Sequence, residues 1–540
     1  MMTPPDRRPT HLWQPLAVLA TLTTILTAGC DAGEPNPAGV AARLFAPAGG
    51  ESPFAAVGWM RVFVRGDGLP TPIAGFSRYA PGARAELPAI PFGPPGARYQ
   101  LVVEGWADGN GAPSFLVASG RSPWFEVEKD GTASLDVMFS KVNAVSELPS
   151  VETRAAQRLQ TGRVGAGVGV TGREVIIAGG GFVTDPNAPW WRGTGFTQVF
   201  PTVEGLDLTS QVVSARRDLR VARALPTVSS IGYGQAIIAG GFGSNGAPVA
   251  DVELYNPPGV DGGQPGALPP LSIPRAGHSA TVIDADARLL LFVGGDAEGT
   301  WELWDPATGS RGRLPLPDAK PRAHHAATAF TVPGRTETAV LVSGGESPTE
   351  VHATAMLYEP VGRAMYPVGQ AMASSRTAHA AAFVSDHGLL YVMGGFSRVD
   401  RQAVTGSIDA FDVGLLAFRS DAGGLVLGTP RGGIQAAVLA DNRVLVAGGV
   451  GEEQPGGGLR PLRTLEMVYD FVDAQTSSRT IRVASSPTSR GAGQLPLLSG
   501  ERVGHAVVGL PSGHGLIVGG AALQSGALQT QLDLQVYNPQ

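Results

Sequence analysis

Short apolar runs that end in a pair of glycines recur along the chain from residue 170 onward, as in VIIAGG from Val175 and VLVAGG from Val444. Each run has the length of a buried β-strand rather than of a helix. The glycine pair permits positive φ and close approach of the backbone in the turn that follows. Its seven copies lie mostly about 50 residues apart, a repeat that predicts a closed radial array of small sheets. The second glycines are Gly180, Gly241, Gly295, Gly345, Gly395, Gly449 and Gly520.

The glycine pair belongs to a unit with four parts in a fixed order. An arginine opens the unit and leads a strand of small residues, as in RAGHSATV from Arg275. The glycine-pair strand follows, and then a strand that closes on an aromatic residue and usually Asn or Asp, as in VELYNP from Val252. An irregular segment leads to the next arginine. The opening arginines are Arg163, Arg223, Arg275, Arg322, Arg376, Arg431 and Arg502.

This order of Arg, His, Gly-Gly and Tyr-Asp-Pro resembles the kelch repeat over roughly 70% of the chain. The resemblance implies a seven-bladed kelch-type β-propeller over residues 143–540. The last unit stops after its Tyr-Asn-Pro, one strand short of a blade. The resemblance therefore implies that residues 142–159 supply the outer strand of the last blade.

An all-β domain is predicted ahead of the repeats, over residues 38–142. Seven candidate strands are separated by turn sequences such as PAGG, ADGNGA and KDG, and no helical period is present. This pattern favours a small β-sandwich, and it is similar to the immunoglobulin-like modules of exported bacterial lipoproteins. The candidate strands are 41–45, 60–65, 85–90, 99–106, 114–118, 124–127 and 133–139.

The first 29 residues have the pattern of a signal peptide. Arg7 and Arg8 precede an apolar stretch that is too short for a comfortable membrane span. The stretch ends at TAGC, which resembles a bacterial lipobox although its leucine, Leu26, lies one place earlier than usual. Cys30, the only cysteine, is therefore the expected site of lipid attachment, with residues 30–37 as a tether. A plain secretory signal is the alternative, and under either interpretation the protein is exported. The lipid anchor would hold it in the bacterial cell envelope, at the outer or inner membrane.

Composition limits the classes of partner that the sequence predicts. The net charge is −6 with no long basic run, which argues against a nucleic-acid partner. A single cysteine allows no internal disulfide, so stability has to come from the buried core. No cofactor is expected.

Recurrence within the chain separates scaffold from site. A residue type present in every unit serves every unit, so the seven arginines are interpreted as scaffold. The resemblance also places them near one mouth of a channel, where contact with an acidic ligand is the alternative. His278, His325, His379 and His505 each lie three residues after such an arginine. Their repeat position is a simpler explanation than a metal site, which needs convergent ligands.

The residues that interrupt the repeat are the better functional candidates. A long insertion after the first glycine pair carries Trp190, Trp191 and Arg192. Adjacent tryptophans in a loop favour a stacking or protein-contact surface. The alternative is a plug that packs over the channel or against the preceding domain. A second loop, after the sixth glycine pair, is interpreted as a solvated segment.

Catalytic motifs are nearly absent: the chain has no HExxH, GxSxG, Walker or CxxC sequence. The copper site of galactose-oxidase-like enzymes needs a cysteine crosslinked to tyrosine, and the only cysteine here lies at the lipobox. The favoured function is a lipid-anchored binding or scaffold protein, more likely not an enzyme, that recognises a protein or glycan at a propeller face. The alternatives are a carbohydrate-active enzyme resembling kelch-type sialate mutarotases and a purely structural envelope protein.

Overall fold

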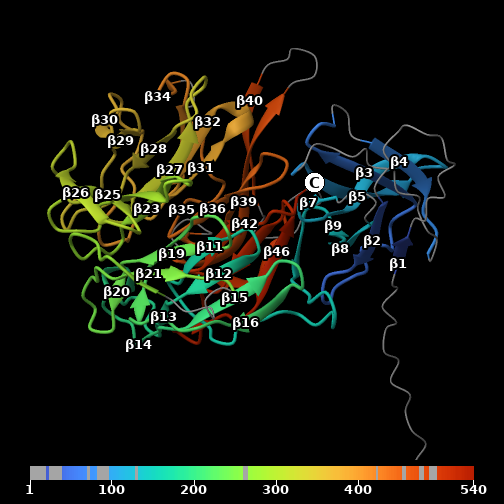
Figure 1. Ribbon diagram of the computed structural model, residues 1–540, viewed down its shortest axis with the longest axis horizontal. Helices are drawn as coiled ribbons and strands as arrows, with labels where there is room; N and C mark the ends of the chain where they lie inside the picture. Colours follow the sequence, from blue (N-terminus) through green and yellow to red (C-terminus); the bar gives the residue numbers. More distant parts are fainter. Residues whose placement is uncertain are drawn as a thin grey trace, which may run out of the picture. The chain divides into compact units, whose positions relative to one another are not determined.

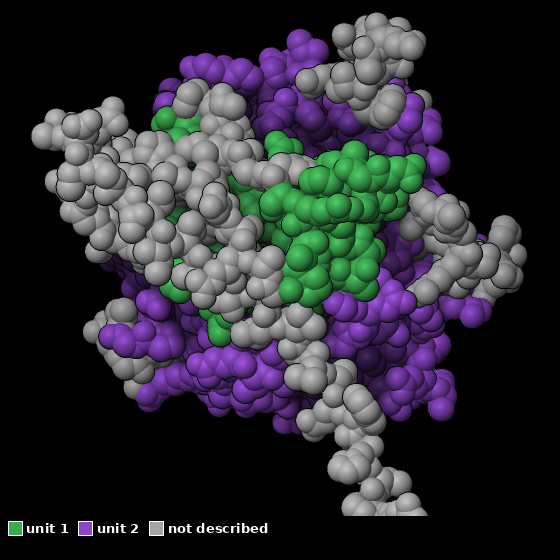
Figure 2. Space-filling view, turned by 90° about the vertical axis from the view of Figure 1, so that its right-hand side faces the viewer, with its two compact units in different colours: residues 1–46, 53–139 green, residues 47–52, 140–540 purple. Residues whose placement is uncertain are grey.

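The computed structural model describes residues 20–23, 39–69, 73–81, 96–127, 132–259, 266–420, 424–452, 458–472, 479–485 and 495–539. The chain divides into two compact units, shown in green and purple in Figure 2. The first comprises residues 1–46 and 53–139, and the second comprises residues 47–52 and 140–540. Cys30 and the predicted tether lie outside the described residues.

The first unit has two sheets that share one apolar core. In one sheet, β2 (Gly39–Phe45) lies between β1 (Ala20–Thr23, antiparallel) and β8 (Thr132–Met138, parallel). The other has the order β4 (Ile73–Arg78), β3 (Trp59–Gly66), β5 (Arg98–Asp108) and β6 (Pro113–Arg121), with β7 (Phe125–Glu126) paired to β5. Alternate residues of β3 are buried, as expected for a strand with one face on a core. Leu44, Val62, Leu101 and Val137 meet in that core.

Six of the strands predicted for this region correspond to β2, β3, β5, β6, β7 and β8. The strand predicted at 85–90 lies outside the described residues. The prediction missed β4, whose sequence IAGFSR contains a glycine and only a short apolar alternation.

The second unit repeats one antiparallel pattern of four strands, as Figure 1 shows for the sheets from β11 to β46. In each sheet the strands pair in the order of the chain. The first three sheets are β11 (Gly167–Val170), β12 (Glu174–Ala178), β15 (Val203–Asp207), β16 (Val212–Ala215); β18 (Thr227–Ser230), β19 (Ala236–Ala239), β21 (Val252–Tyr255), β22 (Gly266–Leu268); and β23 (Ser279–Asp284), β24 (Leu289–Val293), β25 (Thr300–Asp305), β26 (Gly309–Pro315).

The pattern continues to the end of the chain. The next three sheets are β27 (Ala326–Thr331), β28 (Thr338–Ser343), β29 (Ala355–Glu359), β30 (Ala364–Pro367); β31 (Ala380–Val384), β32 (Leu389–Met393), β33 (Ile408–Asp412), β34 (Ala417–Phe418); and β36 (Gln435–Val438), β37 (Val444–Ala447), β39 (Arg460–Val472), β40 (Arg479–Ser485). Short strands pair beside them: β13 (Gly181–Phe182) with β14 (Gln198–Val199), β17 (Arg223–Ala224) with β20 (Phe242–Gly243), β35 (Arg431–Gly432) with β38 (Val450–Gly451), β38 and β41 (Leu497–Arg502) with β39, and β44 (Ala521–Gln524) with β45 (Ala527–Thr530).

The remaining sheet joins segments from opposite ends of the second unit. It has the order β42 (Ala506–Gly509), β43 (Gly515–Val518), β46 (Leu534–Asn538) and β10 (Ala144–Glu147). Val145 is paired with Tyr537 across the last two strands. The strand that completes this sheet therefore lies within residues 142–159, the segment from which the sequence predicts it.

Contacts between the first strands link each sheet to the next. β11, β18, β23, β27, β31, β36 and β42 each pack beside the following one, and β42 packs beside β11. These strands consist of Gly, Ala, Ser, Thr, Val and a few larger residues, which leaves room for close approach. The second strands are buried along their whole length, apart from Thr338 at the start of β28. The described residues thus form an all-β protein with repeated four-stranded sheets, consistent with a β-propeller-like arrangement.

The glycine pairs adopt the backbone conformation that the sequence predicts. Both glycines of every pair have positive φ. A Cβ on Gly179 would lie 2.2 Å from the carbonyl oxygen of Arg223, and one on Gly294 would lie 2.1 Å from that of Arg322. The second glycine of each pair donates its N–H to the carbonyl of the next opening arginine, and Gly520 donates to Arg163 at 2.9 Å. The glycine pair is thus a connection from each sheet to the next.

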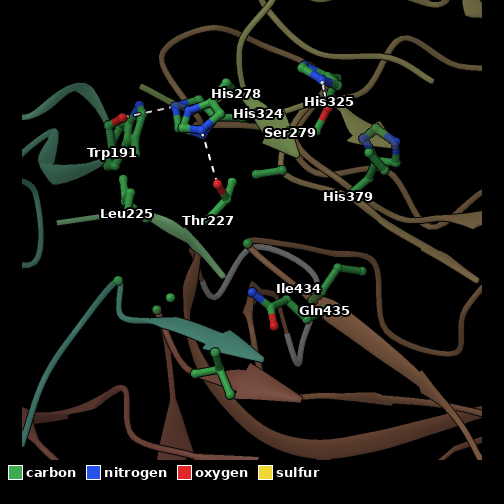
Figure 3. Close-up of a pocket in the computed structure, with 18 of the residues that line it drawn as sticks. Trp191, Leu225, Thr227, His278, Ser279, His324, His325, His379, Ile434 and Gln435 are labelled. Atoms are coloured by element: carbon green, nitrogen blue, oxygen red, sulfur yellow. Dashed lines mark hydrogen bonds between the residues drawn. The ribbon is translucent and has the colours of Figure 1, made fainter. Parts of the chain in front are cut away.

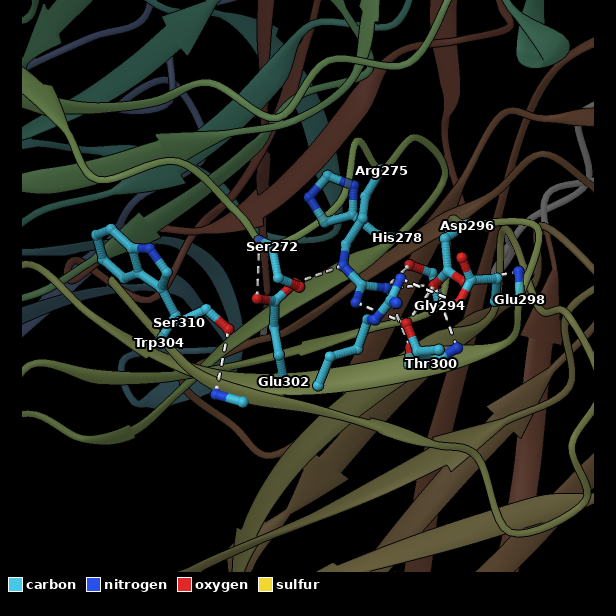
Figure 4. A network of polar contacts seen from close by, with 12 residues as sticks. Ser272, Arg275, His278, Gly294, Asp296, Glu298, Thr300, Glu302, Trp304 and Ser310 are labelled. Carbon is cyan, nitrogen blue, oxygen red and sulfur yellow. Dashed lines mark hydrogen bonds and ion pairs between the residues drawn. The ribbon is translucent and has the colours of Figure 1, made fainter. Parts of the chain in front are cut away.

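The side chains of the opening arginines lie inside the sheets. Arg275 shows the arrangement in Figure 4: its guanidinium donates to the carbonyl oxygens of Gly294 and Thr300 and to the carboxylates of Glu302 and Asp296. All seven arginines are at most 1% exposed, and each binds a carboxylate. Six of these carboxylates come from the third strand or the residue just before it, and Arg322 instead binds Asp318 in the preceding loop. The pairs are Arg163–Glu204, Arg223–Glu253, Arg275–Glu302, Arg322–Asp318, Arg376–Asp409, Arg431–Glu466 and Arg502–Asp533.

The Arg431–Glu466 pair provides a test of this network, because both side chains are fully buried at 2.9 Å. Arg431→Met leaves Glu466 charged and without its guanidinium partner, which should lower the free energy of unfolding by about 3–5 kcal/mol. Urea denaturation followed by circular dichroism measures the change. Arg335→Met is the matched control, because Arg335 is half exposed in its pair with Glu359 and should cost less than about 1 kcal/mol. Equal costs for the two variants would contradict the structural role of the buried arginine.

Candidate functional site

A cavity of about 530 Å³ lies where the first strands of the repeated sheets begin. We call it the central cavity. Every one of the seven repeats contributes lining residues, from the segments 165–168, 225–228, 277–280, 324–328, 378–381, 433–435 and 504–505. Its volume falls within the range of about 300–1,000 Å³ that is typical of small-molecule sites.

Histidines line one side of the central cavity (Figure 3), and the four repeat histidines are each held by a neighbouring sheet. The Nε2 atom of His278 lies 3.2 Å from the hydroxyl of Thr227. His325 lies 2.8 Å from the hydroxyl of Ser279, and His379 lies 2.9 Å from that of Ser343. Three of the four repeat histidines thus bridge to a hydroxyl of the preceding sheet, and His505 bonds to the Ala447 carbonyl in the same way.

These histidines are neutral at physiological pH. Burial lowers the pKa of His278 to about 3 and that of His505 to about 4, and nearby arginines act in the same direction. The same two causes hold the pKa of His325 and of His379 well below the usual value. A neutral imidazole can donate and accept a hydrogen bond, and it brings no charge to the cavity.

The tryptophan insertion forms a wall of the cavity. Trp190, Trp191 and Arg192 form a 3₁₀ turn that Gly193 ends with a φ of 80°. Trp190 is 9% exposed and packs with Val164, Val503 and Leu528. Trp191 is partly buried, and its carbonyl oxygen lies 2.9 Å from Nε2 of His324. Arg192 is exposed and donates to the carbonyl of Val399 at 3.0 Å. The insertion of the first repeat is thus bonded to loops of the fourth and fifth repeats. Of the two tryptophans, Trp191 is the one with a partly exposed side chain in the cavity lining.

Arg401 adds the only charge among the residues that line the central cavity, because none of the described lining residues is an Asp or Glu. Its guanidinium lies 4.2 Å from the centre of the Trp191 ring. Burial lowers its pKa to about 10, so it remains a cation at neutral pH.

The repeat arginines and repeat histidines have different places. The arginine side chains are enclosed in the sheets and leave no guanidinium exposed for an acidic ligand. All four repeat histidines line the central cavity. Among the residues that the structure describes, no three His, Cys, Asp or Glu side chains converge as metal ligands would.

Sequence reasoning did not single out the hydroxyl residues of the lining, nor His324, Gln435 and Arg401. His324 stands beside the repeat histidine in RAHHAATA, and Gln435 follows the Ile that replaces this histidine in RGGIQAAV. Departures from the repeat within the first strand were therefore a usable signal. Arg401 had none, because it lies in a loop whose path depends on the fold.

No protein-family model matches the chain, and a search of the curated proteins finds no match. No helix among the described residues is both long and apolar enough to cross a membrane.

The buried histidines predict a loss of stability at mildly acidic pH. Their folded-state pKa is lowered from about 6.5, so the unfolded chain binds protons that the native state does not, and stability falls as the pH drops below 6.5 towards 4. At pH 5 the loss should be on the order of 1–2 kcal/mol for His278 and for His505. Melting temperatures measured from pH 7.5 to 5 test this.

His278→Gln should make that pH dependence shallower, since it removes one titrating group. The matched control is Thr227→Val, which removes the hydroxyl partner of His278 but keeps the imidazole and should keep the slope. An unchanged slope in His278→Gln would contradict the assignment of the pH dependence to this histidine.

Proposed function

We propose that the second unit is a seven-bladed kelch-type β-propeller that follows an immunoglobulin-like β-sandwich in an exported, lipid-anchored binding protein. The repeated sheets, the contacts that link their first strands and the bond from Gly520 to Arg163 support this arrangement. The strand β10 supports it also, since it completes the last sheet from the other end of the unit.

The central cavity is proposed to bind a neutral, polyhydroxylated ligand, that is, a glycan. The observation that carries this proposal is the chemistry of the lining: neutral imidazoles, the hydroxyls of Thr227, Ser279 and Thr328, and the amide of Gln435. Such groups both donate and accept hydrogen bonds, as sugar hydroxyls do. Trp191 provides an aromatic surface beside them, and a few polar groups placed among apolar ones are typical of small-molecule sites.

The lining favours binding over catalysis. Glycoside hydrolysis needs a pair of carboxylates, and none of the described lining residues has one. General acid–base catalysis at neutral pH needs a pKa near 7, whereas burial lowers the pKa of His278 and of His324 to about 3. The carbohydrate-active enzyme considered from the sequence therefore gains no support from this cavity.

Glycan binding predicts that the protein without its lipid recognises neutral oligosaccharides on an array and in isothermal titration calorimetry. Trp191→Ala should weaken the affinity at least tenfold, because it removes the aromatic surface and about 1.4 kcal/mol or more of binding free energy. Trp191→Phe should restore part of it. Trp190 is unsuitable for this test, since it packs in the apolar core.

Trp124→Ala is the control, because Trp124 is 41% exposed and belongs to the first unit. An affinity that is lost in Trp124→Ala and kept in Trp191→Ala would place the glycan site in the first unit and contradict the proposal. The absence of any neutral glycan ligand would contradict it also.

Lipid anchoring at Cys30 predicts that the protein partitions into the membrane fraction and incorporates a metabolically supplied alkynyl fatty acid. Cys30→Ser should abolish the label, because only the thiol accepts the lipid. In-gel fluorescence after click labelling measures this. Label that persists in Cys30→Ser would contradict the assignment.

A further inference from the structure

A second cavity, of about 280 Å³, also has Trp191 in its lining. We call it the outer cavity. Its lining has Trp190, Trp191, Arg401 and Gly433 in common with that of the central cavity. None of the repeat histidines belongs to the lining of the outer cavity. Its wall is mostly apolar, but it includes charged side chains. The residues used below are Trp190, Trp191, Phe396, Arg401, Arg460 and Leu523.

Arg401 is the least satisfied of the buried arginines discussed above. Its guanidinium lies between the rings of Trp191 and Phe396, at 4.2 and 5.2 Å from their centres. Its one hydrogen bond within the described residues runs from Nη2 to Glu346 at 3.5 Å, the limit for such a bond. Every opening arginine, by contrast, makes at least two bonds, and one of them is always to a backbone carbonyl.

Two donors on this shared wall lack an acceptor among the described residues. They are Nε of Arg401, a residue that is only 7% exposed, and the indole N–H of Trp191. Buried donors are nearly always paired in native proteins, so we expect a hydrogen-bond acceptor near Arg401 and Trp191.

The charged groups around the wall that the two cavities share favour an anionic ligand. Arg192 and Arg401 both act electrostatically on Glu346, which is the one carboxylate that approaches Arg401. The outer lining also includes Arg460 and the exposed Asp400, which is bound by Arg398 at 2.6 Å. A guanidinium binds a carboxylate better than any other common anion-binding side chain does, because the two groups match in planar geometry.

We propose that the outer cavity binds a small organic acid, with its carboxylate on Arg401 and its apolar or aromatic body against Trp190, Phe396 and Leu523. Such a ligand places a carboxylate beside a guanidinium whose one hydrogen bond within the described residues is 3.5 Å long, while the apolar wall covers the rest of the molecule. The outer cavity shares Trp190, Trp191, Arg401 and Gly433 with the central cavity, but the proposal does not require that the central cavity binds a glycan.

The test uses 3-phenylpropanoate as the probe and its amide as the neutral counterpart. The acid should bind the protein in isothermal titration calorimetry and change the fluorescence of the nearby tryptophans, and the amide should bind at least tenfold more weakly. Arg401→Gln should weaken binding of the acid at least tenfold. Arg335→Gln, which removes an exposed arginine outside both cavity linings, should leave binding unchanged.

A second variant keeps the test valid if Arg401→Gln does not fold. Leu523 is 37% exposed at the outer cavity, so Leu523→Asp places a negative charge near the ligand with little cost to folding. It should weaken binding of the acid at least tenfold, whereas the neutral Leu523→Asn should change it less than threefold. Equal binding of acid and amide, wild-type affinity in Leu523→Asp, or no binding of the acid at 10 mM, about the weakest affinity expected of so small a ligand, would each overturn the proposal.

Discussion

The buried ion pair between an opening arginine and a carboxylate is the interaction on which the repeated sheets depend. A guanidinium that is removed from water has to satisfy several donors at once. Arg431 does so by binding two carbonyls near the glycine pair and Glu466 on the third strand. One side chain thus fixes a turn, the end of the second strand and the third strand. The carbonyl of the same arginine accepts the N–H of the preceding glycine pair, so the contact that organises one sheet also attaches it to its neighbour.

This arrangement determines the chemistry of the central cavity. Because the guanidiniums point into the sheets, the residues that follow them in the first strand face the cavity, and these are small side chains, hydroxyls and histidines. The histidines are surrounded by buried arginines, which lower the imidazole pKa together with burial. A network that carries many charges therefore produces a cavity that has almost none. The seven repeated arginines therefore do not form an anion-binding site, because their guanidiniums lie inside the sheets and not in the cavity.

The sequence predicted what the repeat enforces and missed what only the fold brings together. The glycine pairs and the interpretation of the arginines as scaffold follow from recurrence. In the structure both glycines of each pair have positive φ, and the opening arginines are at most 1% exposed. The carboxylate partners Glu253 and Glu302 lie in the motifs VELYNP and WELWDP. The sequence did not predict their role, because the acid is not at the same position in every repeat: Arg322 binds Asp318, which lies in a loop. The tryptophan insertion was found as an interruption. Its contacts with His324 and Arg401 could not be predicted, because they join loops that are more than 100 residues apart in the sequence.

Buried arginines have two roles in this chain, one structural and one in the proposed binding site. The number of hydrogen-bond acceptors around the guanidinium distinguishes the two. An opening arginine binds at least one backbone carbonyl and a carboxylate, so changing it affects folding. Arg401 is equally enclosed, yet it has two aromatic faces and one distant carboxylate. Aromatic rings stabilise a cation without accepting its N–H groups in the plane of the guanidinium. Nε of Arg401 has no acceptor among the described residues, and the two cavities that meet at Arg401 share one wall but differ in the rest of their lining. Burial alone does not distinguish a structural arginine from a binding one in this fold, whereas the count of in-plane acceptors does.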